Sequence, residues 1–143
     1  MDSTVEILEE TAHIINTYGL HTSTQFAADD SDAVDICAAV YLAAEGTCPP
    51  EFSTDETTSI AIIEASAKAM TAIKAISDAL DSDVNETEIV PGLWVPEYIE
   101  HVSNWAATPP IGEKTPPSTS EVIGRIHRAA NTLRSQTSVA HAA

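Results

Sequence analysis

Residues 53–80, STDETTSIAIIEASAKAMTAIKAISDAL, are the stretch that decides the fold. Apolar residues recur along it at steps of seven, four, three and four residues, at Ile62, Ala69, Ile73, Ile76 and Leu80. Such steps place side chains on one face of an α-helix. Ser53-x-x-Glu56 has the spacing of a capping box, which marks a helix start. The pattern therefore predicts one long helix over 54–80, and we expect it at the centre of the fold.

Helical segments are also predicted on both sides of this stretch. A second capping box at Ser3-x-x-Glu6 and a stop at Gly19 bound a helix over 4–18. The carboxylates of residues 29–32 are candidate caps for a helix that reaches Glu45. A third box, Ser118-x-x-Glu121, opens a last helix, with a frayed, flexible tail over 135–143.

The segment between the long helix and the last one is irregular. An acidic loop covers 81–90, and residues 91–117 hold six of the eight prolines. Pro96 suits the first position of a short helix through Ala106, and residues 88–95 could hold one short extended piece. The fold class predicted is all-α, a compact four- to five-helix bundle in a single domain over 1–134, with this Pro-rich segment before the last helix.

The negative charge is unevenly distributed. The formal net charge is −16, and residues 1–67 contain 13 carboxylates without any Lys or Arg. Such a surface repels nucleic acid and anionic lipid, so we expect neither as a direct partner. The start of the chain lacks the pattern of a signal peptide, and no apolar run has the length of a membrane span. An intracellular, cytoplasmic protein is expected.

One set of residues is spread in a fixed order over most of the chain: Ala12, Ile14, Ile15, Gly19, Leu20, Cys37 to Val40, Ala43, Ala44, Gly46, Trp105, Thr119, Glu121, Val122, Arg128 and Ala129. In the order and spacing of these residues, the chain resembles a small uncharacterised family of actinobacteria and their phages. The chain has Ala39-Val40 and Ala106-Ala107 where family members typically have Gly-Ala and Asn-Asp. The resemblance implies a mostly helical intracellular or phage-encoded domain and no particular activity.

The residues that could carry catalysis or bind a metal show no recognisable spacing. The His and Cys residues form neither a Cys-x-x-Cys nor a His-Glu-x-x-His motif. Cys37 and Cys48 are expected to be reduced thiols, and no Gly-rich phosphate loop is present. We therefore expect no catalytic residue, no metal and no cofactor, and not an enzyme.

The favoured hypothesis is an acidic interaction protein that docks on a basic surface of a host or partner protein, with DNA mimicry as a special case. Trp94, Tyr98 and Trp105 fall in the Pro-rich segment and either anchor such an interface or complete the core. The alternative explanation of the charge is that it serves only solubility or adaptation to salt. The candidate partner-binding residues are Glu6, Glu9, Glu10, Asp29, Asp30, Asp32, Asp35, Trp94, Tyr98 and Trp105.

Two other classes of function stay open. One is a small ligand-binding module or enzyme, whose pocket between helices is lined by Trp105, Tyr98, His101 and Cys37. The other is a structural subunit of a homo-oligomer.

Overall fold

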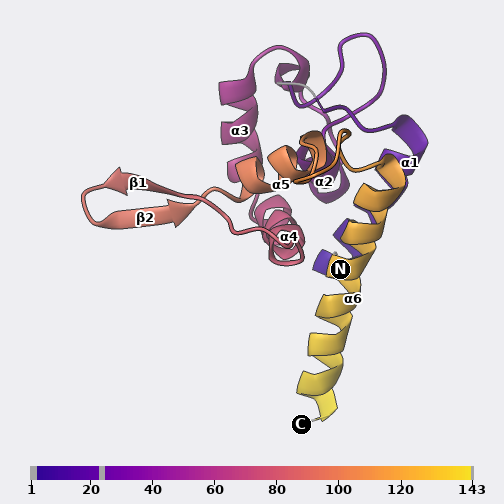
Figure 1. The fold of residues 1–143 in the computed structure, drawn as a ribbon, viewed down its shortest axis with the longest axis vertical. Helices are drawn as coiled ribbons and strands as arrows, with labels where there is room; N and C mark the ends of the chain where they lie inside the picture. The colour runs from indigo at the N-terminus through magenta and orange to yellow at the C-terminus, as the bar shows by residue number, and fades with distance from the viewer. Residues whose placement is uncertain (1–2, 23–24, 143) are drawn as a thin grey trace.

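The computed structural model describes residues 3–22 and 25–142, which form six α-helices, one 3₁₀ turn and a two-stranded hairpin (Figure 1). In chain order the elements are α1 (Thr4–Tyr18), α2 (Ile36–Glu45), η1 (Pro50–Ser53), α3 (Glu56–Glu64), α4 (Ala67–Asp78), β1 (Glu86–Val90), β2 (Leu93–Pro96), α5 (Tyr98–Ala107) and α6 (Thr119–Ala142). The fold is mostly helical, as expected, but it is not all-α and it has more helices than four to five.

The second half of the 54–80 stretch, α4, packs against the five other helices, as a central helix should, but the most deeply buried helix is α2. Its residues from Ile36 to Val40 are all completely buried. A helix that is apolar on every side has to be covered on every side, and α1, α3, α4 and α5 all pack against α2. Because Ala38 and Ala39 have small side chains, the surrounding helices can approach closely.

The predicted long helix is two helices. The helix is interrupted at Ala65. Ser66 is the N-cap of α4, and its hydroxyl oxygen accepts a hydrogen bond from the amide of Ala69 at 3.1 Å. The Ser66 hydroxyl also donates to the Glu45 carboxylate at 2.6 Å, which ties the break to the end of α2. The N-cap of α3 is Asp55, not Ser53. The predicted apolar face nevertheless holds in α4, where the side chains of Ala69, Ile73 and Ile76 are fully buried.

The second helix begins later than expected because the chain before it makes other contacts. Carboxylates 29–32 do not cap α2, whose N-cap is Asp35. The amides of Phe26 and Ala27 both donate to the Phe52 carbonyl, at 2.8 and 2.9 Å, and the Asp35 amide donates to the Phe26 carbonyl at 2.7 Å. These bonds hold residues 25–35, which we call the connector and which lead into α2, against η1 instead of in a helix.

The second half of the predicted acidic loop, residues 86–90, is strand β1 of a β-hairpin. Strands β1 and β2 pair antiparallel, with Glu88 opposite Trp94 and Val90 opposite Leu93. Pro91 and Gly92 make the turn, and Gly92 has φ of 86°, which glycine adopts without strain. The hairpin extends away from the helical body (Figure 1).

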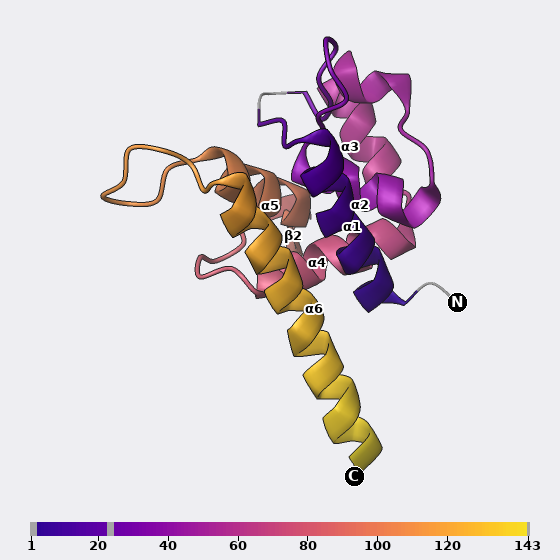
Figure 2. The ribbon, with the colours of Figure 1, turned by 90° about the vertical axis from the view of Figure 1, so that its right-hand side faces the viewer.

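The first and last helices lie side by side, as Figures 1 and 2 show, and α1 packs against α6. Two of the three predicted capping boxes start their helices: the Glu6 amide donates to Ser3 Oγ, and the Glu121 amide donates to Ser118 Oγ. The C-terminal part of α6 runs past the body, through Ala142. The helix thus continues beyond the expected end at 134; flexibility of 135–143 stays a prediction.

Replacing Ile73 by Ala should lower the free energy of unfolding by about 2 to 5 kcal/mol, because the Ile73 side chain is completely buried and its removal leaves a cavity. Urea denaturation followed by circular dichroism measures the change. Thr71→Ala, an exposed site on the same helix, is the control and should change stability by less than about 0.5 kcal/mol. A similar small loss for Ile73→Ala would show that this face does not pack in the core.

Candidate functional site

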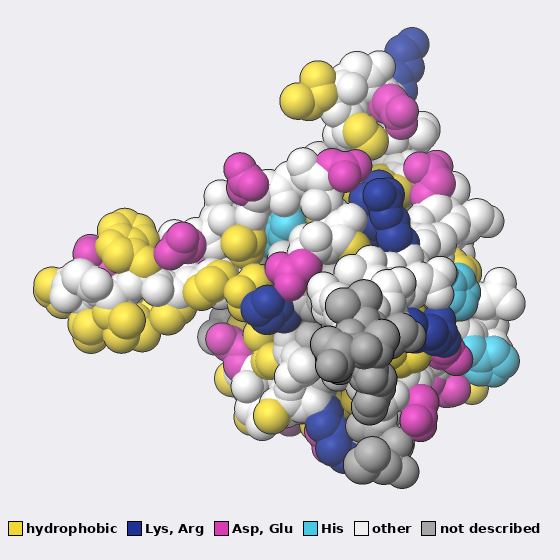
Figure 3. All heavy atoms as spheres, turned by 90° about the horizontal axis from the view of Figure 1, so that it is seen from below, with side chains coloured by type: hydrophobic (Ala, Val, Ile, Leu, Met, Phe, Trp, Pro, Cys, Tyr) yellow, Lys and Arg dark blue, Asp and Glu magenta, His cyan; other side chains and the backbone are white. Residues whose placement is uncertain are grey.

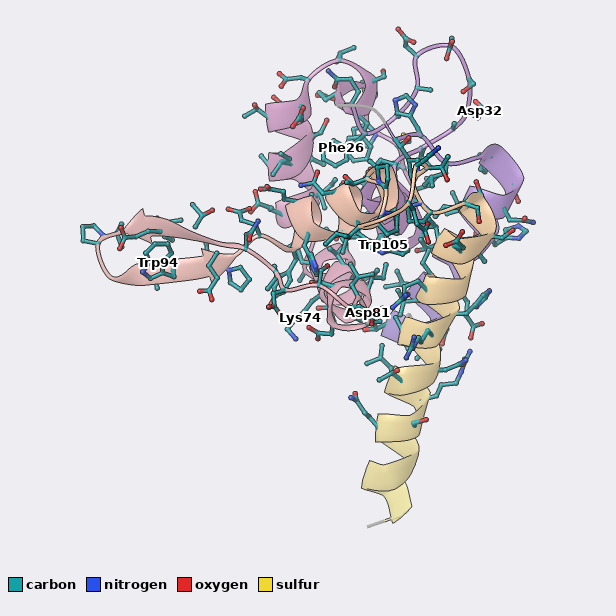
Figure 4. The ribbon with its side chains drawn as sticks, viewed as in Figure 1. Phe26, Asp32, Lys74, Asp81, Trp94 and Trp105 are labelled. Atoms are coloured by element: carbon teal, nitrogen blue, oxygen red, sulfur yellow. The ribbon has the colours of Figure 1, made fainter. Side chains whose placement is uncertain are left out.

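The N-terminal carboxylates predicted to form one docking surface fall into two separate groups. Glu6, Glu9 and Glu10 are exposed on the first half of α1, where Glu9 also pairs with Arg134 of α6. Asp29, Asp30 and Asp32 are exposed on the connector beside the C-terminal end of α1 (Asp32 is labelled in Figure 4). At 1.5 Å per residue, the helix between Glu6 and Tyr18 alone spans about 18 Å. The two groups therefore cannot contact the same small feature of a partner.

Asp35, predicted as an exposed partner-binding residue, is buried. Only 5% of it is exposed, and its carboxylate accepts hydrogen bonds from the Cys37 amide at 2.8 Å and from the Ser103 hydroxyl at 3.0 Å. Burial raises the pKa of Asp35 to about 7, although these hydrogen bonds act in the opposite direction. Asp35 is therefore a poor steering charge, and it titrates near neutral pH.

Cys37, which lies close to Asp35, packs in the core. It is completely buried, and its pKa is raised well above the ordinary value by burial and then by the Asp35 charge. A nucleophilic cysteine needs an accessible thiolate, so Cys37 is unsuited to that role. Cys48 is also a free thiol, exposed in the loop after α2, and partial burial raises its pKa as well.

A cavity of about 610 Å³ lies directly beside Asp35. We call it the carboxylate pocket. It is formed where the N-terminal ends of α2, α3 and α5 meet the connector, and it is lined among the described residues by Thr22, Gln25, Phe26, Asp35, Glu56, Ile60, Glu97, Ile99, Glu100, Ser103, Asn104 and Ala107. Four of these are carboxylic acids, and none is Lys, Arg or His.

Three of these acids, Glu56, Glu97 and Glu100, were not predicted as site residues. Each lies at or near the first turn of its helix, a position that carboxylates favour because the helix dipole is positive there. The sequence shows that preference but not that the three helix ends meet. Only the tertiary fold brings these residues beside Asp35.

The three aromatic residues of the Pro-rich segment do not form one cluster. Trp94 lies on the hairpin and is 55% exposed, whereas Trp105 lies on the helical body (Figure 4). The Trp105 ring is partly buried with the Arg125 guanidinium 5.7 Å above its centre, and the Tyr98 ring lies 5.9 Å from Lys74 Nζ. Trp105 and Tyr98 pack on the core, and Trp94 projects away from it.

A second cavity, of about 850 Å³, includes Trp105 and His101, two residues of the predicted inter-helix pocket. Both ring nitrogens of His101 are hydrogen-bonded, to Ser77 Oγ at 2.6 Å and to Ser82 Oγ at 2.8 Å. Tyr98 and Cys37 do not line this cavity. The pocket predicted from sequence therefore exists in part, but its histidine is held by two serines.

Most of the exposed large apolar side chains in the described part of the chain are on the hairpin. Ile89, Val90, Leu93 and Trp94 are each between 49% and 56% exposed. Hydrophobic side chains follow both sides of this arm, with Asp and Glu beside them (Figure 3). Large side chains of this kind are rarely left in water unless they contact another molecule.

No arrangement of three or more His, Cys, Asp or Glu within residues 3–22 and 25–142 could hold a metal ion. The acids of the carboxylate pocket therefore do not form a tight metal-binding cluster.

In the part of the chain that the structure describes, none of the helices has both the length and the apolar character needed to cross a bilayer.

These features define a small, mostly helical domain with an acidic pocket and a projecting apolar hairpin. The chain belongs to DUF6197, a family of unknown function, whose family model matches residues 1–132. This confirms the resemblance to a family without an assigned activity. No curated protein and no solved structure matches the chain.

Asp35→Asn should change how stability depends on pH. Because the pKa of Asp35 is raised on folding, its stabilising effect is complete below the unfolded value of 3.8 and is lost as the pH rises through about 7. Asn keeps the N-cap but cannot ionise. Relative to wild type, the variant should therefore gain about 3 kcal/mol between pH 4.5 and 7.5, as measured by urea denaturation. Parallel pH profiles for the two proteins would contradict the raised pKa.

Proposed function

We propose that this protein is a non-enzymatic, intracellular interaction protein that holds a partner protein through the β1–β2 hairpin. The observation that carries the proposal is the position of Ile89, Val90, Leu93 and Trp94, which are half-exposed on an arm that extends from the body. The helical core is complete without them. Aromatic and large aliphatic side chains of this kind are the usual anchors of protein interfaces.

The charge around the hairpin specifies the chemistry of the partner. Residues 75–113 contain eight carboxylates and no Lys or Arg, and two of the carboxylates, Glu86 and Glu88, are on β1 itself. An apolar groove with Lys and Arg on its rim is the complement of such an arm. A second copy of the chain or an anionic membrane would place like charges together, so both are disfavoured.

The shape of the hairpin also suits docking. A hairpin of two strands is at best marginally stable alone in water, and this one is joined to the body where the Glu97 amide donates to the Asn85 carbonyl at 2.8 Å. Its outer strand edges have no strand partner among the described residues. A partner can therefore stabilise the arm both by covering its apolar side chains and by pairing with an edge strand.

The carboxylates of the N-terminal half have a separate role in this proposal. Glu6, Glu10, Asp29 and Asp30 are exposed on α1 and on the loop after it, which lie across the body from the hairpin (Figure 1), so they increase the rate of encounter with a basic partner instead of forming its main contacts. DNA mimicry is the special case in which that partner normally binds nucleic acid. A phage or actinobacterial origin, implied by the family resemblance, would fit such a role and stays a prediction.

A second candidate is a ligand-binding module, favoured by the cavity beside Trp105. The stacked Trp105 and Arg125 side chains and the His101 ring line this cavity, together with the carboxylates of Asp81, Glu97, Glu100 and Glu121. It differs from the hairpin in needing a small molecule, so a thermal shift with a small-molecule library separates the two candidates.

The hairpin proposal predicts a site-specific photocrosslink. A benzophenone amino acid at position 94 should crosslink a basic protein in a cell lysate, whereas the same group at position 111 should not. Ile111 is the matched control because it is fully exposed and apolar but lies outside the hairpin. The crosslink should weaken at high salt, since part of the attraction is between exposed charges.

Competition distinguishes specific docking from adhesion. Excess wild-type protein and excess Ile111→Ser protein should both abolish the crosslink at position 94, and excess Leu93→Ser/Trp94→Ser protein should not. Equal competition by all three would show that the hairpin does not carry the interaction. Light scattering on the free protein identifies self-association, which would replace the foreign partner by a second copy.

Neutralising the distant carboxylates should change the rate of association and not the contact itself. With Glu6→Gln, Glu10→Gln, Asp29→Asn and Asp30→Asn combined, the association rate constant with the crosslinked partner should fall several-fold at low salt, and its salt dependence should flatten. Surface plasmon resonance at several ionic strengths measures both. An unchanged rate and salt response, with lower solubility, would show that this acidity serves only solubility.

A further inference from the structure

The carboxylate pocket combines an opening of ligand size with an unusual distribution of charge. Its volume of about 610 Å³ falls within the roughly 300–1,000 Å³ of small-molecule sites. Asp35 is buried beside it, and three glutamates at the starts of α3 and α5 line it, Glu97 partly buried and Glu56 and Glu100 exposed. None of its lining residues, within the part of the chain that the structure describes, carries a positive charge.

The helix ends around the pocket do not cancel this charge. Three helices, α2, α3 and α5, begin at the pocket, and each N-terminus contributes roughly half a positive charge. Together they offset less than two of the four carboxylates even when all are ionised. The pocket therefore favours a cation, and the net charge of −16 on the chain favours it further.

The spacing of polar and apolar groups argues for an extended organic cation. The four acids come from three different elements and do not form a group that could share one metal ion. The apolar side chains of Phe26 and Ile60 line the same pocket. A chain of methylenes with ammonium groups at its ends can contact both kinds of surface at once, because its charges are separated and its middle is apolar.

One further group in the pocket requires a hydrogen-bond donor. Gln25 Oε1 is buried and has no partner among the described residues. A buried acceptor without a partner is destabilising. Gln25 lines the pocket, so a rotation of its side chain would bring this oxygen to an ammonium group, which has N–H donors for it and for a carboxylate.

We propose that the carboxylate pocket binds an aliphatic di- or polyamine. The ammonium groups bind Asp35, Glu56, Glu97 and Glu100, and the methylenes pack on Phe26 and Ile60. This site lies on the helical body, is built from residues that the hairpin does not contribute, and does not depend on the hairpin having a protein partner.

Isothermal titration calorimetry in 150 mM salt tests the proposal with 1,4-diaminobutane and spermidine. Wild-type protein should bind at least one of them saturably, with a stoichiometry of one. Glu56→Gln/Glu100→Gln should weaken binding at least tenfold. The control, Glu6→Gln/Glu10→Gln, removes the same charge from exposed sites on α1 and should change the affinity less than twofold.

A second variant tests the cavity without changing its charge. Ala107 lines the pocket, and Ala107→Phe should fill it and abolish saturable binding while circular dichroism shows an intact fold. The proposal is overturned if wild-type protein binds neither amine, if several amines bind per chain, or if the pocket pair and the α1 pair weaken binding equally. The last two results would mean diffuse attraction to an acidic surface.

Discussion

The rest of the structure depends on burying α2 from all sides. Five consecutive residues of this helix, Ile36 to Val40, have no exposed surface, so the other helices must surround it. Burying its N-terminal end also buries the cap, Asp35, together with its charge. The Ser103 hydroxyl and the Cys37 amide compensate in part by donating to that carboxylate. The acidic pocket is thus a consequence of placing this helix at the centre.

The sequence predicted the helix starts that depend only on hydrogen bonds between residues close together in the chain. The capping boxes at Ser3 and Ser118 gave the starts of α1 and α6, because each box is complete within four residues. The break at Ser66 was missed because it also depends on Glu45, 21 residues away. The hairpin was missed as a pair of strands, although the Pro91-Gly92 turn between two apolar runs was a usable signal.

The candidate site could be predicted only in part, for a similar reason. The sequence left open whether Trp94 is exposed or completes the core, and it is exposed; grouping it with Trp105 assumed that neighbours in sequence are neighbours in space. Asp35 was selected for its charge, and its burial follows from α2 being apolar all round, a feature already visible in the sequence. Glu56, Glu97 and Glu100 became site residues only because three helix ends converge.

The central claim is that α2 is the element around which the chain packs, with the hairpin outside that core. Amide hydrogen exchange on the free protein tests it most directly. The amides of Val40 to Ala44 should exchange only through global unfolding, whereas those of residues 86–96 should exchange orders of magnitude faster through local opening. Exchange from α2 at a rate similar to that of the hairpin, or clearly faster than that of α4, would contradict the account.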